Sequence, residues 1–173
     1  MTDNTELPTT SFWSHHGWLE EATAWIQEQL HHLHYTVAGD IKQVYTSPTS
    51  CVLNVATTSG DIYFKACAPL FKYEPLLTQT ISQLLPAYTV HVLSVDNERS
   101  WFLMEDAGLS LRELMVEQRD LKRWESSLSL FAHFQMESIS YSAELKAAGC
   151  PDRTLARIPD LFDALLSDTS VLL

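Results

Sequence analysis

Lys65 lies at the end of an alternating apolar run in the stretch GDIYFKACAPLFKYEP, residues 60–75, and a Glu-Pro pair follows nine positions later. A lysine that must reach a phosphate sits on a strand and points into a cleft. A lysine on a solvated strand face, whose stem only covers apolar surface, produces the same pattern. The residues alone therefore leave both interpretations open for Lys65.

Other residues that could do chemistry do not form a recognisable site. His31, His32 and His34 end a helical pattern without a cysteine or acidic set to complete a metal site, and histidines are favoured at such helix ends anyway. The three cysteines have no metal-site spacing and are odd in number, so we expect reduced, buried thiols. No metal site is predicted.

Composition restricts the classes of function. The 173 residues carry a net charge of −11, which argues against a nucleic-acid-binding surface because that would need a basic patch. No apolar run reaches about 18 residues, so no membrane span is expected. The acidic, polar N-terminus is unlike a secretory signal, and we expect a cytoplasmic protein.

Periodicity divides the chain into strands followed by helices. Residues 14–34 have apolar residues at spacings of three and four, which predicts a helix. Short β-rich runs, a second helix opened by Pro75, and two further β-rich runs follow at 41–47, 51–58, 61–67, 75–85, 89–95 and 100–105. Beyond Gly108 the pattern is helical only, over 109–118, 121–149 and 158–166.

This order predicts an α+β fold with an antiparallel five-stranded sheet rather than a parallel βαβ sheet. We expect one lobe over residues 1–108, with Lys65 on the strand face opposite the core-packed Ile62, Phe64 and Ala66. Residues 109–173 are expected to begin a second, helical part.

From about Trp25 onward, the sequence resembles the small lobe of the aminoglycoside phosphotransferase family, whose members share a protein-kinase-like fold. The resemblance rests on IYFKA with Lys65, YEPLLT with Glu74, and WFLMEDAG, residues 101–108. It implies that Lys65 contacts ATP phosphates and that Glu74 is its carboxylate partner. It also implies that the connector, with Met104, Glu105 and Ala107, contacts adenine.

One departure from the family pattern affects the expected nucleotide binding, and the absent catalytic motif described below is a second. The position of a glycine-rich phosphate loop reads Thr-Ser-Pro-Thr-Ser-Cys, residues 46–51, so Thr49 and Ser50 would have to meet the phosphates without any glycine. Glu74 precedes Pro75, which biases it away from helical geometry and leaves open a simple helix-dipole role.

The catalytic His-x-Asp motif of the family is absent from the sequence, and the chain ends at Leu173 before its expected position. We therefore expect the N-terminal portion of an ATP-dependent small-molecule phosphotransferase, inactive alone. Mg²⁺ would need the missing part, the acceptor would be a small hydroxylated molecule, and exposed lobe surface would favour self-association. Alternatives are an acidic chaperone-like or adaptor-like module and a nucleotide-binding, pseudokinase-like regulator.

Overall fold

The computed structural model describes residues 13, 15–118 and 122–167. Its strands form one antiparallel sheet in the order β1-β2-β3-β5-β4. The strands are β1 (Val37–Thr46), β2 (Ser50–Thr57), β3 (Gly60–Cys67), β4 (Val92–Asp96) and β5 (Trp101–Glu105). The helices are α1 (Trp18–His32), α2 (Glu74–Leu84), α3 (Leu111–Gln118), α4 (Lys122–Ser138), α5 (Ser142–Ala147) and α6 (Ile158–Ser167). The predicted α+β class and the antiparallel five-stranded sheet are confirmed.

The two faces of the sheet differ because side chains alternate along each strand. In β2, Cys51, Leu53 and Val55 are fully buried while the residues between them are half-buried. The tight turn between β2 and β3 fixes this register: Thr57 pairs with Gly60, whose φ of 118° suits glycine. The buried side chains Ile62, Phe64 and Ala66 of β3 therefore share one face with those of β2, whereas the buried Cys67 belongs to the other face.

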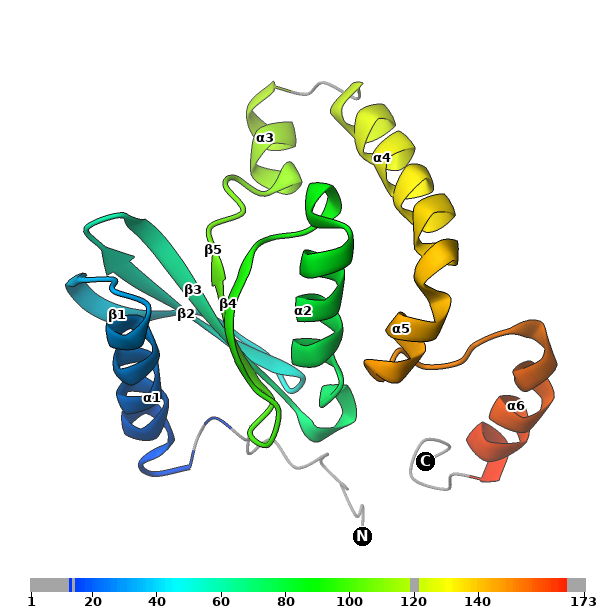
Figure 1. The fold of residues 1–173 in the computed structure, drawn as a ribbon, viewed down its shortest axis with the longest axis horizontal. Coiled ribbons are helices and arrows are strands. Elements are labelled where there is room, and N and C mark those ends of the chain that lie inside the picture. The colour runs from blue at the N-terminus through cyan, green and yellow to red at the C-terminus, as the bar shows by residue number, and fades with distance from the viewer. Residues whose placement is uncertain (1–12, 14, 119–121, 168–173) are drawn as a thin grey trace, which may run out of the picture.

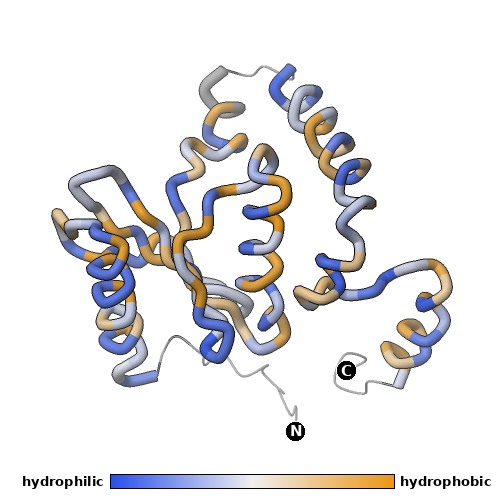
Figure 2. The backbone as a smooth tube through the Cα atoms, viewed as in Figure 1, coloured by the Kyte–Doolittle hydropathy of each residue, from blue (hydrophilic) through white to orange (hydrophobic). Residues whose placement is uncertain are grey.

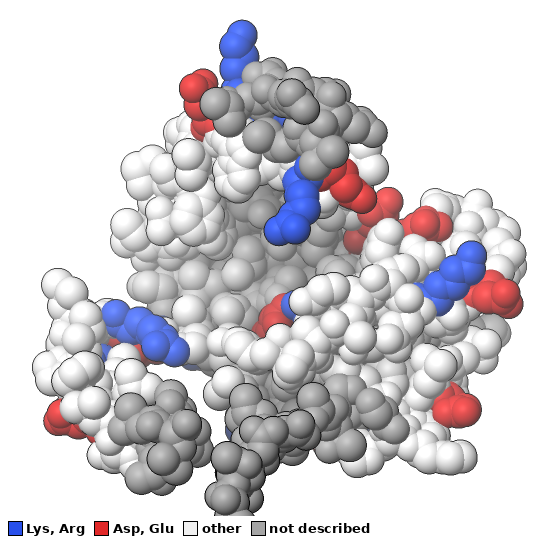
Figure 3. Space-filling view, turned by 180° about the vertical axis from the view of Figure 1, so that it is seen from behind, with Lys and Arg blue, Asp and Glu red and all other residues white. Residues whose placement is uncertain are grey.

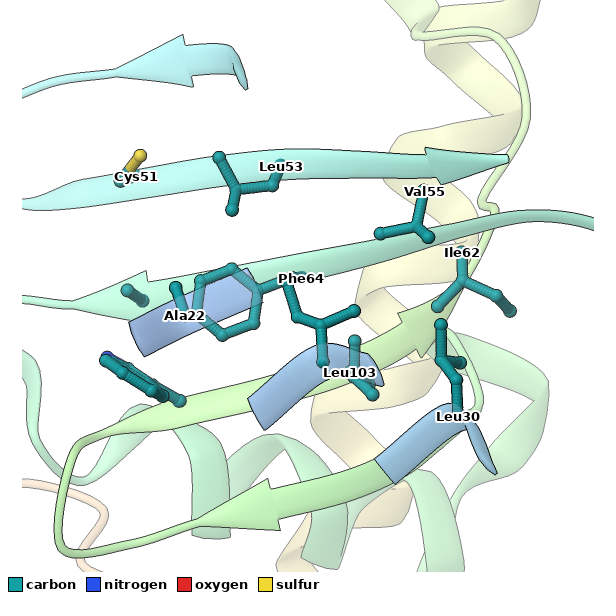
Figure 4. Packing of buried hydrophobic residues seen from close by; sticks show 11 residues of the cluster. Ala22, Leu30, Cys51, Leu53, Val55, Ile62, Phe64 and Leu103 are labelled. Carbon is teal, nitrogen blue, oxygen red and sulfur yellow. The ribbon is translucent and has the colours of Figure 1, made fainter. Parts of the chain in front are cut away.

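Helix α1 covers the buried face of the sheet (Figure 1). Ala22, Ile26 and Leu30 recur every four residues and have no exposed surface, so one stripe of the helix enters the core. Figure 4 shows Ala22 and Leu30 beside Leu53, Phe64 and Leu103, which come from three neighbouring strands. The main core thus lies between α1 and strands β2, β3 and β5.

Aromatic rings fill one end of this core. Phe64 and Trp101 lie edge to face with ring centroids 5.4 Å apart, and Trp25 contacts both of them. Trp18, at the start of α1, meets Trp101 at an interplanar angle of 89°. Such edge-to-face contacts add to the stabilisation from burial alone.

Helix α2 packs on the opposite face of the sheet, near β4 (Figure 1). Its buried Ser82 accepts a hydrogen bond from the Val92 backbone N–H at 3.2 Å and so ties the helix to β4. A smaller buried cluster of Cys67, Val92 and Phe102 lies on this face. The α2 side of the sheet is therefore less fully covered than the α1 side.

Within residues 109–118 and 122–167 the structure contains helices and no strand. Tyr88 connects α4 to the sheet part: its hydroxyl donates to Glu137 at 2.5 Å, and its ring lies 5.6 Å from that of Phe134. Hydrophobic residues recur along α4 and α6 (Figure 2), although many of their side chains are exposed. None of the described helices is long and apolar enough to cross a membrane.

Several element boundaries differ from the predicted ones; for example, β1 begins at Val37, four residues before the predicted start. The predicted helix 121–149 is interrupted by the 3₁₀ turn Ile139–Tyr141, which separates α4 from α5. The strand predicted at 89–95 corresponds to β4, which begins only at Val92 and ends at Asp96. The described residues 15–17 of the predicted first helix are not helical. Helix α1 begins at Trp18, because Gly17 is its N-cap residue and has a φ of 90°.

Strand β1 is one edge of the sheet and is irregular. Its pairing with β2 shifts register between Val37 and Ile41 and again between Gln43 and Tyr45. Such bulges add an unpaired residue and bend the strand.

Candidate functional site

Lys65 lies on the central strand of the sheet. It is paired with Val52 on β2 and with Phe102 on β5, and its side chain is 23% exposed on the α2 side. This is the face opposite Phe64 and Ala66, as the alternation predicted. Its ammonium group is thus fixed to a rigid part of the molecule rather than to a loop.

Glu74 is the partner of Lys65: the Lys65 ammonium donates to Glu74 Oε1. Glu74 lies at the helix edge, as expected from Pro75, but it is the first residue of α2 rather than outside the helix, and Tyr73 before it already has helical angles. Contacts of the carboxylate with the sheet hold it there, and Pro75 suits the first turn of a helix. The ion pair therefore links β3 directly to α2.

Cys67 belongs to the same cluster and was missed by the sequence reasoning. Its thiol donates to the second carboxylate oxygen, with Sγ 3.3 Å from Glu74 Oε2. Burial first, and then the negative charge of Glu74, raise the pKa of the Cys67 thiol to about 12, although Lys65 opposes the shift. Strand alternation places Cys67 on the same face as Lys65, but nothing in the sequence indicates its contact with Glu74.

The rest of this sheet face is apolar and only partly covered. Val52, Tyr63 and Met104 are half-buried there, around the buried Phe102. Asn54 donates to Asp61 at 3.1 Å near the far end of the same strands. A flat apolar surface thus lies next to a fixed cation, an arrangement able to receive a planar ring joined to an anionic group.

The β1–β2 turn contains the predicted phosphate-contacting residues Thr49 and Ser50. It lies at the end of the sheet where β3 finishes, since Ser50 pairs with Cys67. The backbone N–H groups of Thr49 and Ser50 both donate to the Ser47 hydroxyl, at 3.2 and 3.1 Å. The turn is therefore stabilised by Ser47, and its exposed Thr49 hydroxyl, 3.1 Å from Ser47 Oγ, is the group best placed to meet an anion.

The connector residues lie at the other end of β5. Met104 is half-buried on the Lys65 face, whereas Glu105, Asp106 and Ala107 are exposed. The Glu105 N–H donates to the His91 carbonyl at 3.0 Å, so that amide is already paired. A cavity of about 540 Å³ lies between residues 86–91 and 105–107, and the His91 ring lies 3.3 Å from the Glu105 carboxylate.

Lys65 and the connector are separated along β5, because Lys65 pairs with Phe102 and the connector starts at Glu105. Three to five residues of strand correspond to roughly 10 to 17 Å. Figure 3, which views the molecule from behind, shows a hollow between the sheet part and the helices. It is lined mainly by uncharged side chains.

Among the described residues, no group of three or more histidine, cysteine or acidic side chains could hold a metal ion. A scan against protein-family models finds no match, and searches among curated proteins and among solved structures find none either.

Proposed function

We propose that this chain is the nucleotide-binding part of an ATP-dependent small-molecule phosphotransferase. The observation that carries the proposal is the Lys65–Glu74 ion pair on a half-open apolar sheet face. Catalysis of phosphoryl transfer depends mostly on positioning and electrostatic stabilisation, so a phosphate-contacting lysine must be held firmly.

The charges of the cluster support this role for Lys65. Its ammonium is the only cationic group in the Lys65–Glu74–Cys67 cluster, and the thiol stays protonated at neutral pH because its pKa is raised. One carboxylate oxygen holds Lys65 while the other accepts the thiol, so the ammonium has further protons for phosphate oxygens. The Thr49 hydroxyl would provide a second contact at the end of the sheet.

The adenine would lie on the apolar face between Val52 and Met104, towards the connector. The separation of Lys65 from residues 105–107 suits an extended nucleotide. Since the Glu105 N–H is already paired, we expect contacts with the connector to come from Ala107. ATP would supply the transferred phosphoryl group, and the acceptor would be a small hydroxylated molecule.

Titration with ATP, followed by thermal unfolding and calorimetry, tests the proposal. Lys65→Ala should weaken ATP binding about tenfold or more, because a hydrogen bond to a charged group contributes about 1.5–3 kcal/mol. Lys42→Ala is the matched control, since Lys42 is exposed on the edge strand β1. No ATP-dependent shift in the parent protein, or the same shift in both variants, would rule the site out.

A second candidate function is a non-catalytic interaction module. The observation in its favour is the number of exposed apolar side chains on α4 and α6, among them Leu128, Phe131 and Phe162. Such a module would not need Lys65, so nucleotide would not change its unfolding temperature. The ATP titration therefore separates the two candidates.

A further inference from the structure

A second cavity, of about 360 Å³, lies where α1 begins and where the turn between β4 and β5 meets the end of β3. Three indole side chains line it: Trp13, Trp18 and Trp101. Its volume is at the lower end of the range for small-molecule sites. Cys67 lines it but Lys65 and Glu74 do not, so the cavity adjoins the Lys65–Glu74–Cys67 cluster without including the ion pair.

The indole walls are held in place by contacts within the protein. Trp13 donates its indole N–H to the Ser47 carbonyl at 2.8 Å. Its ring lies 5.4 Å from Trp18 at 61°, and Trp18 lies 6.3 Å from Trp101 at 89°. These edge-to-face contacts fix the three rings relative to one another, and all three line the cavity.

Ser100 gives this cavity a polar group without a partner. It lines the cavity, is only 7% exposed, and its hydroxyl makes no hydrogen bond within residues 13, 15–118 and 122–167. Its backbone φ of 60° is uncommon for a residue other than glycine. Among the described residues no buried side-chain nitrogen or oxygen lacks a hydrogen-bond partner, so this unpaired hydroxyl is accessible from the cavity and can bond to a molecule there.

The charges around the cavity favour an uncharged ligand. The Arg99 guanidinium donates to Glu21 at 2.9 Å and to Asp96 at 2.7 Å, and it lies 5.5 Å from the Trp101 ring centre. The other charged residues of the lining, Lys72 and Glu98, have opposite signs. The cavity thus has no excess charge that would select a cation or an anion.

We propose that this cavity is a binding site for a small, uncharged, planar aromatic molecule that carries a hydroxyl or a ring N–H. The aromatic body would lie among Trp13, Trp18 and Trp101, and its polar group would hydrogen-bond to Ser100. The inference does not depend on nucleotide binding.

Phenol and toluene are suitable probes, because they match in size and differ in the hydroxyl group. Each is titrated into protein with ¹⁵N-labelled tryptophan, and the indole N–H resonances are followed by NMR. Trp13, Trp18 and Trp101 should shift saturably, while Trp124 on α4 serves as the internal control. Phenol should bind about fivefold more tightly than toluene, as expected for one hydrogen bond.

Two variants test the role of Ser100. Ser100→Ala removes the hydroxyl and keeps a Cβ at the unusual φ, whereas Ser100→Gly removes the hydroxyl and accepts that φ freely. The preference for phenol should disappear in both, and Ser100→Gly provides the test if Ser100→Ala does not fold. Shifts that never saturate, equal shifts at Trp124, or a phenol preference that survives in Ser100→Gly would overturn the proposal.

Discussion

The Glu74 carboxylate divides its two oxygens between a lysine and a thiol, and this division defines the candidate site. The pairing of Lys65 with Glu74 was predicted from the family resemblance, whereas their positions on a strand and at a helix start follow from the sequence pattern. Cys67 could not be predicted as part of the site, because its contact with Glu74 depends on how α2 docks on the sheet. Ser47 was missed for a related reason: the sequence of a turn does not show from which backbone N–H groups a serine hydroxyl will accept hydrogen bonds.

The raised pKa of Cys67 leads to a pH-dependent stability. An acid whose folded pKa is above its unfolded value stabilises the fold fully below the unfolded pKa, near 9, and loses this contribution as pH rises to about 12. The slope is at most about 1.4 kcal/mol per pH unit. Urea unfolding between pH 8 and 11 should show a steeper loss in the parent protein than in Cys67→Ala.

The comparison with Cys67→Ala cancels contributions that the two proteins share, such as that of Cys51, whose pKa burial also raises. Parallel stability curves for the two proteins would show that the thiol does not keep its proton in the fold.

At the scale of elements, α1 illustrates how a buried stripe determines stability. Ile26→Ala should lower the free energy of unfolding by about 2–4 kcal/mol, because Ile26 is fully buried against the sheet and its removal leaves a cavity. Leu19→Ala on the same helix is the matched control: Leu19 is 46% exposed, and we expect a loss below about 1 kcal/mol. Urea titration measures both values, and equal losses would contradict the described packing.

Elements with a clear period were predictable, and interruptions set by packing were not. The stripe Ala22, Ile26, Leu30 located α1, and strand alternation located β2 and β3. The break after Ser138 carries no glycine or proline, so no residue there indicates a division of the predicted helix 121–149. Residues 89–91 suit a strand by composition but lie before the start of β4 at Val92.

At the scale of the whole molecule, burial is uneven. The sheet and α1 enclose fully buried side chains. In contrast, α4 (residues 122–138) and α5 (residues 142–147) contain no buried side chain, and Ala148, directly after α5, is buried. Exposed apolar area of this extent is unusual for a monomer.

We therefore expect the protein to self-associate in a concentration-dependent way through its helical part. Leu128→Glu with Phe131→Glu should reduce association, because Leu128 and Phe131 are 62% and 56% exposed on α4. Leu70→Glu is the control, since Leu70 is 78% exposed but lies beside the sheet. Sedimentation velocity measures the outcome, and an equal effect of both changes would place the contact elsewhere.

The bulges in β1 affect how other molecules could associate with this edge of the sheet. An unbroken edge strand offers a regular row of N–H and C=O groups on which a strand of another molecule can add, and such addition can continue into fibrils. Val44 and Tyr45 are 54% and 55% exposed on this edge, so the side chains alone would not prevent it. The two register shifts interrupt the row, and β1 therefore makes a poor template for amyloid-like growth.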